Sequence, residues 1–224
     1  MLRSPSARGY LTPQQARRVY DRIGRIQDWQ AIYEGLAIRE LVKLGEFQSA
    51  KSVLEFGCGT GAFAAKLMTI VPTDCRYVGI DVTPKMTRLA GSRLKRWADR
   101  ATVKLSDGSP ALPEADGAFD HFVSNYVFEL LSPDYAATVV EEAHRVLSPN
   151  GKLCLVSLGC GSSGLARLVT ALWEAVWRCK PQLVGGCRPS DLSTLLSSNK
   201  WSVDHHGRVV SFGTTSEVVV ASRR

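Results

Sequence analysis

Residues 53–61 read Val53-Leu54-Glu55-Phe56-Gly57-Cys58-Gly59-Thr60-Gly61, an apolar run that leads into three alternate glycines. We expect a buried strand, a tight loop and the start of a helix, because glycine permits sharp turns and close approach to a ligand. A helix N-terminus also offers unpaired N–H donors. The segment therefore predicts a site for a nucleoside cofactor at the end of a strand.

Asp81 supports that prediction, since it ends the next expected strand, where a carboxylate can accept both ribose hydroxyls. The spacing of Gly57, Gly59 and Ala62 also fits the G-x-G-x-x-A form of a dinucleotide site, so an NAD-dependent oxidoreductase stays open as an alternative. Glu55 favours another cofactor, because its negative charge would repel a pyrophosphate and suits an ammonium and a sulfonium.

The rest of the chain alternates short β-branched runs with helical patterns, which is typical of a parallel sheet with crossover helices. Expected strands cover residues 52–56, 76–81, 102–105, 119–124 and 152–158, with a late antiparallel pair at 201–209 and 217–221. Expected helices cover residues 61–70, 84–98 and 133–147, and Asn150-Gly151 is expected to turn the chain into a strand. Before residue 50 the chain reads as helical, with helices beginning at Thr12-Pro13 and at an Asp28 cap.

Composition points to one soluble domain. The chain has 224 residues, 45% apolar and 22% charged, which is an ordinary globular balance. No apolar run is long enough to cross a bilayer, and the N-terminus lacks the apolar stretch of a secretory signal. We therefore expect a cytoplasmic protein, and leave peripheral contact with a membrane open.

Cysteines and basic residues both favour structural roles over metal or nucleic-acid binding. None of the six cysteines forms a C-x-x-C pair, so we expect no metal site, with Cys75 and Cys154 as reduced core residues. The net charge of +7 is concentrated in one segment, which most simply forms a solvated helix face. Its members are Lys85, Arg88, Arg93, Lys95, Arg96, Arg100 and Lys104.

Several motifs in one order resemble the class I S-adenosylmethionine-dependent methyltransferases. The E-x-G-x-G-x-G loop is followed by Asp81, Ser106-Asp107-Gly108, Phe119-Asp120 and the run Arg145 to Leu153, over residues 53–158. The resemblance implies a Rossmann-like α/β fold with a mostly parallel seven-stranded sheet, helices on both faces and N-terminal lid helices. The Y-D-R-I run at Tyr20 to Ile23, with Leu112-Pro113, is similar to ubiquinone and menaquinone C-methyltransferases.

The same resemblance implies where S-adenosylmethionine binds. Glu55 and the glycine loop would surround its methionine part, Asp81 its ribose, and Val82 and Met86 its adenine. Asp107 would accept the adenine amino group, with Ser106 and Gly108 beside it. Facing the methionine and the transferred methyl would be Ser124, Asn125 and Tyr126. The loop residues meant are Gly57, Cys58, Gly59 and Gly61.

No catalytic residue can be named from the sequence, because the methyl donor is already activated and a dedicated base is optional. We expect His121 and His144 to be packed histidines, and His205 and His206 to lie away from the glycine loop. Tyr20 and Tyr33 would approach the cofactor if the N-terminal helices form a lid.

The acceptor is expected to be a small, apolar or aromatic molecule. Residues 159–164 form a small-residue loop, and Trp173 and Trp177 behind it either line an apolar pocket or pack as helix core. A nucleic-acid acceptor is disfavoured, because Ser124-Asn125-Tyr126-Val127-Phe128 lacks the Pro-Pro of nucleobase amino methyltransferases. The expected helix before Cys179 has one apolar face, made of Leu165, Leu168, Val169, Leu172 and Val176.

The predicted organisation is a single domain, 1–224, with a lid (1–50), a cofactor core (51–158) and acceptor-side helices with a strand hairpin (159–224). Methyl transfer from S-adenosylmethionine is the predicted activity, and the oligomeric state stays open. The alternatives are an NAD-dependent oxidoreductase and a non-catalytic cofactor-binding protein of the same fold.

Overall fold

A computed structural model describes residue 10, residue 15 and residues 31–224, apart from 162–163, 185 and 212. The predictions for the helix after Thr12, for the Asp28 cap and for Tyr20 lie outside these residues, as does the side chain of Tyr33.

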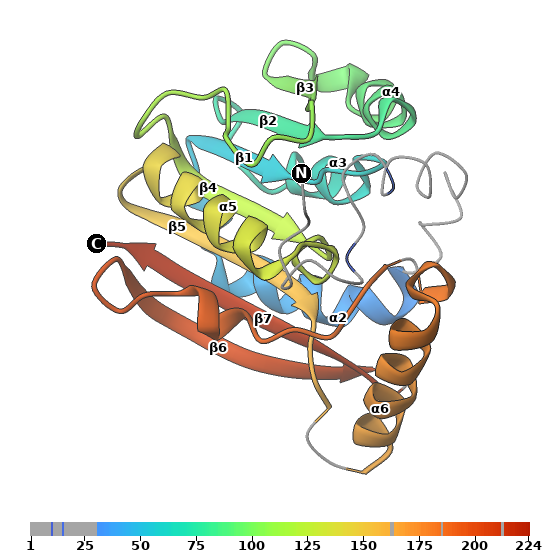
Figure 1. Cartoon of the computed structure of the whole chain (residues 1–224). Coiled ribbons are helices and arrows are strands. Elements are labelled where there is room, and N and C mark those ends of the chain that lie inside the picture. Colours follow the sequence, from blue (N-terminus) through green and yellow to red (C-terminus); the bar gives the residue numbers. More distant parts are fainter. Residues whose placement is uncertain (1–9, 11–14, 16–30, 162–163, 185, 212) are drawn as a thin grey trace.

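A single seven-stranded sheet runs through the molecule, in the order β3-β2-β1-β4-β5-β7-β6 (Figure 1). The strands are β1 (Ser52–Phe56), β2 (Arg76–Asp81), β3 (Ala101–Leu105), β4 (Phe119–Asn125), β5 (Leu147–Leu158), β6 (Trp201–Ser211) and β7 (Thr214–Arg223). The first five pair in parallel, whereas β7 is antiparallel to both β5 and β6. This confirms the predicted mostly parallel sheet and its terminal hairpin.

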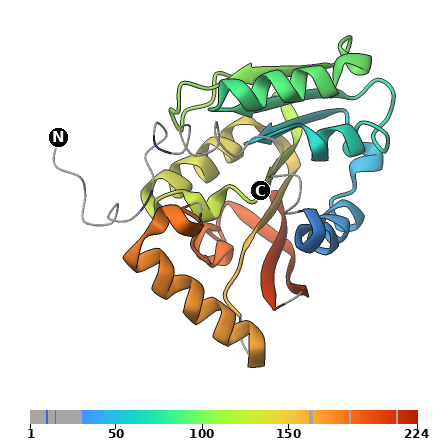
Figure 2. The ribbon, with the colours of Figure 1, turned by 90° about the vertical axis from the view of Figure 1, so that its right-hand side faces the viewer.

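Helices cover both faces of the sheet, as the views in Figures 1 and 2 agree. They are α2 (Ala31–Leu44), α3 (Ala62–Leu67), α4 (Pro84–Arg93), α5 (Pro133–Val146) and α6 (Gly164–Cys179). The short helices are η3 (Phe47–Ser49), η4 (Lys95–Trp97), η5 (Phe128–Leu130), η6 (Pro181–Val184) and η7 (Leu192–Leu195).

Two apolar layers hold these helices to the sheet. On one face, Val139, Val140 and Ala143 of α5 pack on alternate strand residues. On the other, Ala37 and Leu41 of α2 join α3 in a layer against the reverse side. Because side chains alternate along a strand, each buried strand contributes to both layers.

Two predicted boundaries differ from the structure. The helix expected at 84–98 ends at Arg93 and continues as η4. The Asn150-Gly151 turn lies inside β5, which begins directly after α5 at Leu147. Asn150 has φ 62°, and the pairing register with β4 shifts nearby, so the chain bends without leaving the sheet.

Candidate active site

The glycine loop leaves β1 at the carboxyl edge of the parallel strands and enters α3. All three glycines have positive φ: 77° at Gly57, 51° at Gly59 and 73° at Gly61. A Cβ at Gly57 would lie 2.3 Å from Val127 Cγ2, and one at Gly61 would lie 2.9 Å from Ala90 Cα. The loop is therefore restricted to glycine by both backbone conformation and space.

Asp81, at the end of β2, holds the loop in place. Its Oδ2 accepts the Gly59 N–H at 2.9 Å and its Oδ1 accepts the Thr83 N–H at 2.8 Å. A carboxylate has about four acceptor positions, so ribose hydroxyls can still bind. Asp81 is thus a structural residue of the loop as well as the predicted ribose ligand.

Most amides of the glycine loop are bound within the protein. Gly57 N and Cys58 N both donate to the Ile80 carbonyl, at 2.8 and 3.0 Å, and Gly61 N donates to Cys58 O at 2.9 Å. The Cys58 side chain is buried beside Gly79, so only its backbone can face a ligand. These loop amides are therefore not available to a pyrophosphate, whereas the unpaired donors expected at the start of α3 stay a prediction.

Glu55 lies beneath the loop with almost no solvent exposure. Burial raises the pKa of its carboxyl to about 7, against the opposing influence of Tyr77 and the nearby Asn125 amide. The Tyr77 hydroxyl donates to Glu55 Oε2 at 2.5 Å, and burial raises the Tyr77 pKa well above its usual value. Glu55 is therefore only partly ionised near pH 7, and a neighbouring cation would favour its charged form.

Residues at the end of β4 differ in whether their side chains form hydrogen bonds within the protein. The Ser124 hydroxyl is fully buried and donates to Phe56 O, so it joins β4 to β1 below the loop. Tyr126 has φ 54° and its hydroxyl contacts Ser216 Oγ at 2.7 Å. Among the described residues, the buried Oδ1 and Nδ2 of Asn125 have no partner at hydrogen-bond geometry, although the amide is near enough to Glu55 to affect its pKa. An unpaired buried amide at this edge suits a polar ligand group.

The predicted adenine residues lie around the ends of β2 and β3. Met86 is buried in α4, whereas Val82 is partly exposed. Asp107 is exposed and accepts the Ser109 N–H, and Ser106 Oγ accepts the Gly108 N–H. Tyr135 of α5 also donates to the Gly108 carbonyl at 3.0 Å. Sequence analysis did not single out Tyr135, because no motif marks it.

Glu129 is a second residue that the sequence did not reveal. It lies in η5, just past β4, and only 3% of it is exposed. Ser157 Oγ donates to Glu129 Oε2 at 2.8 Å, and burial raises the carboxyl pKa to about 7, against hydrogen bonds from Ser157 and the backbone. A carboxyl with such a pKa can accept a proton near neutral pH.

The side of the molecule that the sequence predicts to bind the acceptor is built by α6 and the segment after it. A small pocket is lined by Leu158, Gly159, Val169, Thr170, Trp173, Pro189, Thr214 and Thr215. Trp173 Nε1 donates to Cys187 O, and Trp177 Nε1 donates to Gly186 O. Tyr10 packs edge-on against Trp177 at 5.3 Å. Trp173 thus lines the pocket, and Trp177 is buried behind it.

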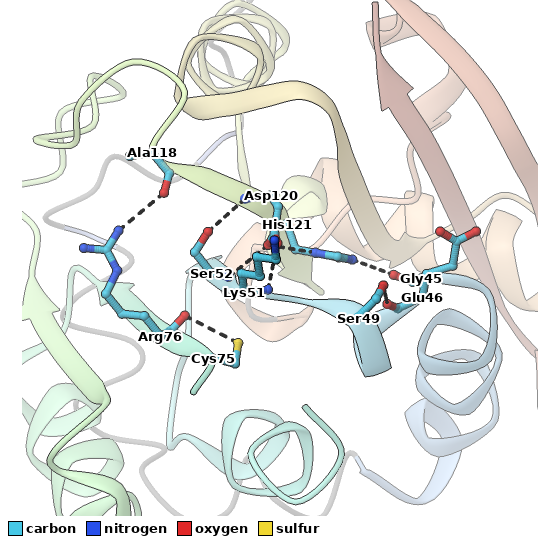
Figure 3. Close-up of polar contacts among 10 residues, drawn as sticks. All are labelled: Gly45, Glu46, Ser49, Lys51, Ser52, Cys75, Arg76, Ala118, Asp120 and His121. Carbon is cyan, nitrogen blue, oxygen red and sulfur yellow. Dashed lines mark hydrogen bonds and ion pairs between the residues drawn. The ribbon is translucent and has the colours of Figure 1, made fainter. Parts of the chain in front are cut away.

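The histidines lie away from the glycine loop, as expected. Figure 3 shows the contacts of His121: Nε2 contacts Gly45 O at 2.8 Å and Nδ1 contacts Asp120 Oδ1 at 3.1 Å. His121 pairs with Val53 near the start of β1, whereas the glycine loop follows the end of that strand. Burial opposes ionisation of Asp120, but hydrogen bonds from His121, Lys51 N and Ser52 N together lower its pKa. This cluster joins β1, β4 and the end of α2.

The other histidines also have structural contacts. Desolvation lowers the pKa of His144, whose ring lies against Trp201. His205 Nε2 lies 3.1 Å from Glu40, and His206 Nε2 lies 2.5 Å from Glu217. Three residues of kinds that can bind a metal have ligand atoms within 4.8 Å of one another: Asp191, His206 and Glu217. Each of them already has a hydrogen-bond partner in the protein.

Three of the seven members of the basic segment make internal contacts. Arg93 donates to Thr60 O and Oγ1 beside the glycine loop, and Arg100 donates to the carbonyls of Met68, Pro72 and Cys75. Lys104 pairs with Glu114. Arg88, Lys95 and Arg96 are exposed, which fits the solvated face that the sequence predicts.

Comparison with known proteins agrees with this site. Residues 53–151 match the family model described as a methyltransferase domain. These residues are therefore similar to a methyltransferase domain, and the order of the strands is that of the expected class I fold. None of the helices in the described part is long and apolar enough to cross a membrane.

Individual relatives are similar over part of their length. A demethylmenaquinone methyltransferase of Lactococcus lactis is 32% identical over 105 residues, 47% of this chain and 41% of that protein. An arsenite methyltransferase of Aquipseudomonas alcaligenes is 36% identical over 108 residues, 45% of this chain and 31% of that protein. The chain therefore spans less than half the length of these curated relatives.

Solved structures share the fold over nearly the whole chain. The N-methyltransferase NodS from Bradyrhizobium japonicum, in complex with S-adenosyl-L-homocysteine, has a TM-score of 0.70 at 20% identity, covering 93% of this chain and 98% of its own. The [4+2]-cyclase SpnF has a TM-score of 0.74 at 16% identity, covering 96% and 97%. The class I fold is thus confirmed.

Proposed function

We propose that this protein transfers a methyl group from S-adenosylmethionine to a small apolar or aromatic acceptor. The observation that carries the proposal is the pairing of two acidic side chains, Glu55 and Asp81, with a glycine loop in which the N–H groups of Gly57, Cys58, Gly59 and Gly61 are already bound. Such a site suits a cationic ligand with a ribose and offers little to a pyrophosphate.

The residues fit that cofactor. Asp81 would accept the ribose hydroxyls, and the unpaired Asn125 amide would bind a polar group of the methionine end. Glu55 would compensate positive charge from below the loop. S-adenosylmethionine, when bound, supplies a methyl group on a sulfonium that is a good leaving group. The chain then has to align the acceptor and exclude water, which can supply about 7 to 11 kcal/mol of the barrier.

Acceptor chemistry is supported by the apolar pocket behind the loop 159–164. Val169, Trp173 and Pro189 offer carbon surface, which favours an apolar or aromatic molecule. Glu129 lies on the same side and would take a proton from an acceptor that must lose one, because its pKa is near neutrality. By their names, the demethylmenaquinone methyltransferase relatives act on a compound of this general kind, which supports the proposal.

An NAD-dependent oxidoreductase is the first alternative, and the bound loop amides argue against it. A chemistry other than methyl transfer is the second, since a protein titled as a [4+2]-cyclase has the same fold. Calorimetric titration with S-adenosylmethionine, S-adenosylhomocysteine and NAD tests the first. Turnover on phenols, quinones, amines and thiols tests the second, with methylated product as the expected result. Tight NAD binding, or no methylation of any acceptor class, would contradict the proposal.

A further inference from the structure

Helix α6 presents an apolar row to solvent. Leu165, Leu168, Leu172 and Val176 are 66%, 57%, 60% and 38% exposed, and we call these four residues the α6 stripe. Their spacing of three and four residues places them in a line along one side of the helix. Single exposed leucines are ordinary, but a continuous row on a surface helix indicates a binding surface.

The buried side of α6 is a different one. Ala166 and Trp177 are buried, and the indoles of Trp173 and Trp177 bind the 186–187 segment. Figure 2 shows α6 lying at the edge of the molecule, away from the central sheet. The predicted apolar face of this helix therefore points outward, while the tryptophans attach the helix to the protein.

Positive charge lies on the polar side of α6. At 100° per residue, Arg167 and Arg178 are roughly 80 to 100° away from Leu168, the nearest residue of the stripe, and Lys180 follows the end of the helix. Glu174 is the only acidic residue from 164 to 180, and it lies 3.5 Å from Arg178. The segment thus keeps an excess of positive charge on a chain whose net charge is +7. An apolar row on a helix whose polar side carries positive charge is the pattern of a helix that lies in the surface of an anionic membrane.

The stripe is also next to the acceptor pocket. Val169, Thr170 and Trp173 of the same helix form one wall of that pocket. A membrane against the stripe would therefore lie about one helix diameter, roughly 10 Å, from the pocket. An apolar acceptor dissolved in the lipid would have a short path to it.

We propose that the α6 stripe docks on the surface of an anionic lipid bilayer and so brings the acceptor pocket to a lipid-dissolved acceptor. The identity of the acceptor rests on the proposed methyltransferase function, whereas the docking does not. A second copy of the chain is a poorer occupant, because the excess positive charge of the two α6 segments would repel.

The test is sedimentation of the full chain with vesicles of phosphatidylcholine, either pure or containing about one third phosphatidylserine. We expect binding to the anionic vesicles that weakens at high salt and is far weaker on the neutral ones. Leu172→Glu should lower the apparent affinity at least about tenfold, because it places a charge in the stripe. Leu36→Glu is the matched control: Leu36 is 45% exposed on α2, and its replacement should leave binding unchanged.

Unchanged near-ultraviolet circular dichroism would show that the variants fold, and Leu172→Gln replaces Leu172→Glu if that variant does not. The proposal is overturned if the wild type does not bind anionic vesicles, or if Leu36→Glu loses as much binding as Leu172→Glu. It is also overturned if the wild type forms dimers that Leu172→Glu abolishes while vesicle binding persists. Vesicle binding without methyl transfer would leave the docking intact and refute only the proposed function.

Discussion

The Tyr77 hydroxyl on β2 donates a 2.5 Å hydrogen bond to the Glu55 carboxylate on β1, within a fully buried pair directly below the glycine loop. Parallel pairing places Tyr77 opposite Val53, so the phenol reaches along the sheet to the end of the neighbouring strand. The donor keeps a carboxylate at a place where burial alone would neutralise it. The pair therefore links the sheet core to the charge of the cofactor site.

Tyr77→Phe removes that donor while keeping the ring. The Glu55 pKa should rise further, and the free energy of unfolding should fall by about 1 to 3 kcal/mol, because a buried acceptor loses its partner. Urea denaturation measures the stability change. Equal stability of the variant and the wild type would mean that the hydrogen bond contributes nothing net.

The stability of the protein should depend on pH through two buried carboxyls. Folding raises the pKa of both Glu55 and Glu129 from 4.5 to about 7, so the folded state holds more protons between these values. The free energy of unfolding should therefore fall as pH rises from about 4.5 to 7, by about 3 kcal/mol per group. Glu129→Gln should remove the part of this pH dependence that comes from Glu129, as denaturation at several pH values would show. A slope equal to that of the wild type would refute the raised pKa of Glu129.

Glu55→Gln tests the choice of cofactor. The neutral amide should weaken S-adenosylmethionine binding, and the loss should change little with salt, because Glu55 is buried and ions screen buried charges much less than exposed ones. Calorimetric titration at two salt concentrations measures this, with NAD as the comparison ligand. Gain of cofactor affinity in the variant would restore the oxidoreductase alternative.

Replacement of Asp81 should affect both the cofactor and the loop. Asp81→Asn keeps one oxygen acceptor, whereas Asp81→Ala leaves the N–H groups of Gly59 and Thr83 without their partner. Both should weaken cofactor affinity about ten- to a hundredfold, and the alanine variant, which leaves two N–H groups unpaired, should lose about 1 to 3 kcal/mol more stability than the asparagine variant, which leaves one. Thermal melts with and without ligand separate the two effects. Equal cofactor affinity in all three proteins would remove Asp81 from the site.

His121→Phe tests whether the role of His121 is structural or catalytic. The change breaks the contacts with Gly45 O and Asp120 at the edge opposite the glycine loop, so stability should fall by about 1 to 3 kcal/mol. Cofactor affinity and turnover should stay at the wild-type level below the melting transition. A selective loss of turnover with normal stability would show that His121 takes part in catalysis.

Local sequence was sufficient for the sheet and for the glycine loop. Five parallel strands and the loop were predictable, because buried parallel strands need apolar β-branched runs and a tight loop needs glycine at positive φ. The end of α4 and the start of β5 were not. In β5, Asn150 takes a positive φ inside the strand instead of turning the chain ahead of it.

Only the tertiary structure decided which groups meet at the site. The sequence shows Glu55 next to a glycine loop, but its raised pKa comes from burial between neighbouring strands, and its donor Tyr77 lies 22 positions away. Glu129 carries no motif, and its proton affinity depends on Ser157 of another strand. The sequence also did not show which side of α6 faces solvent. Periodicity shows that the helix has an apolar side, but the packing of Trp173 and Trp177 decides that this side is the exposed one.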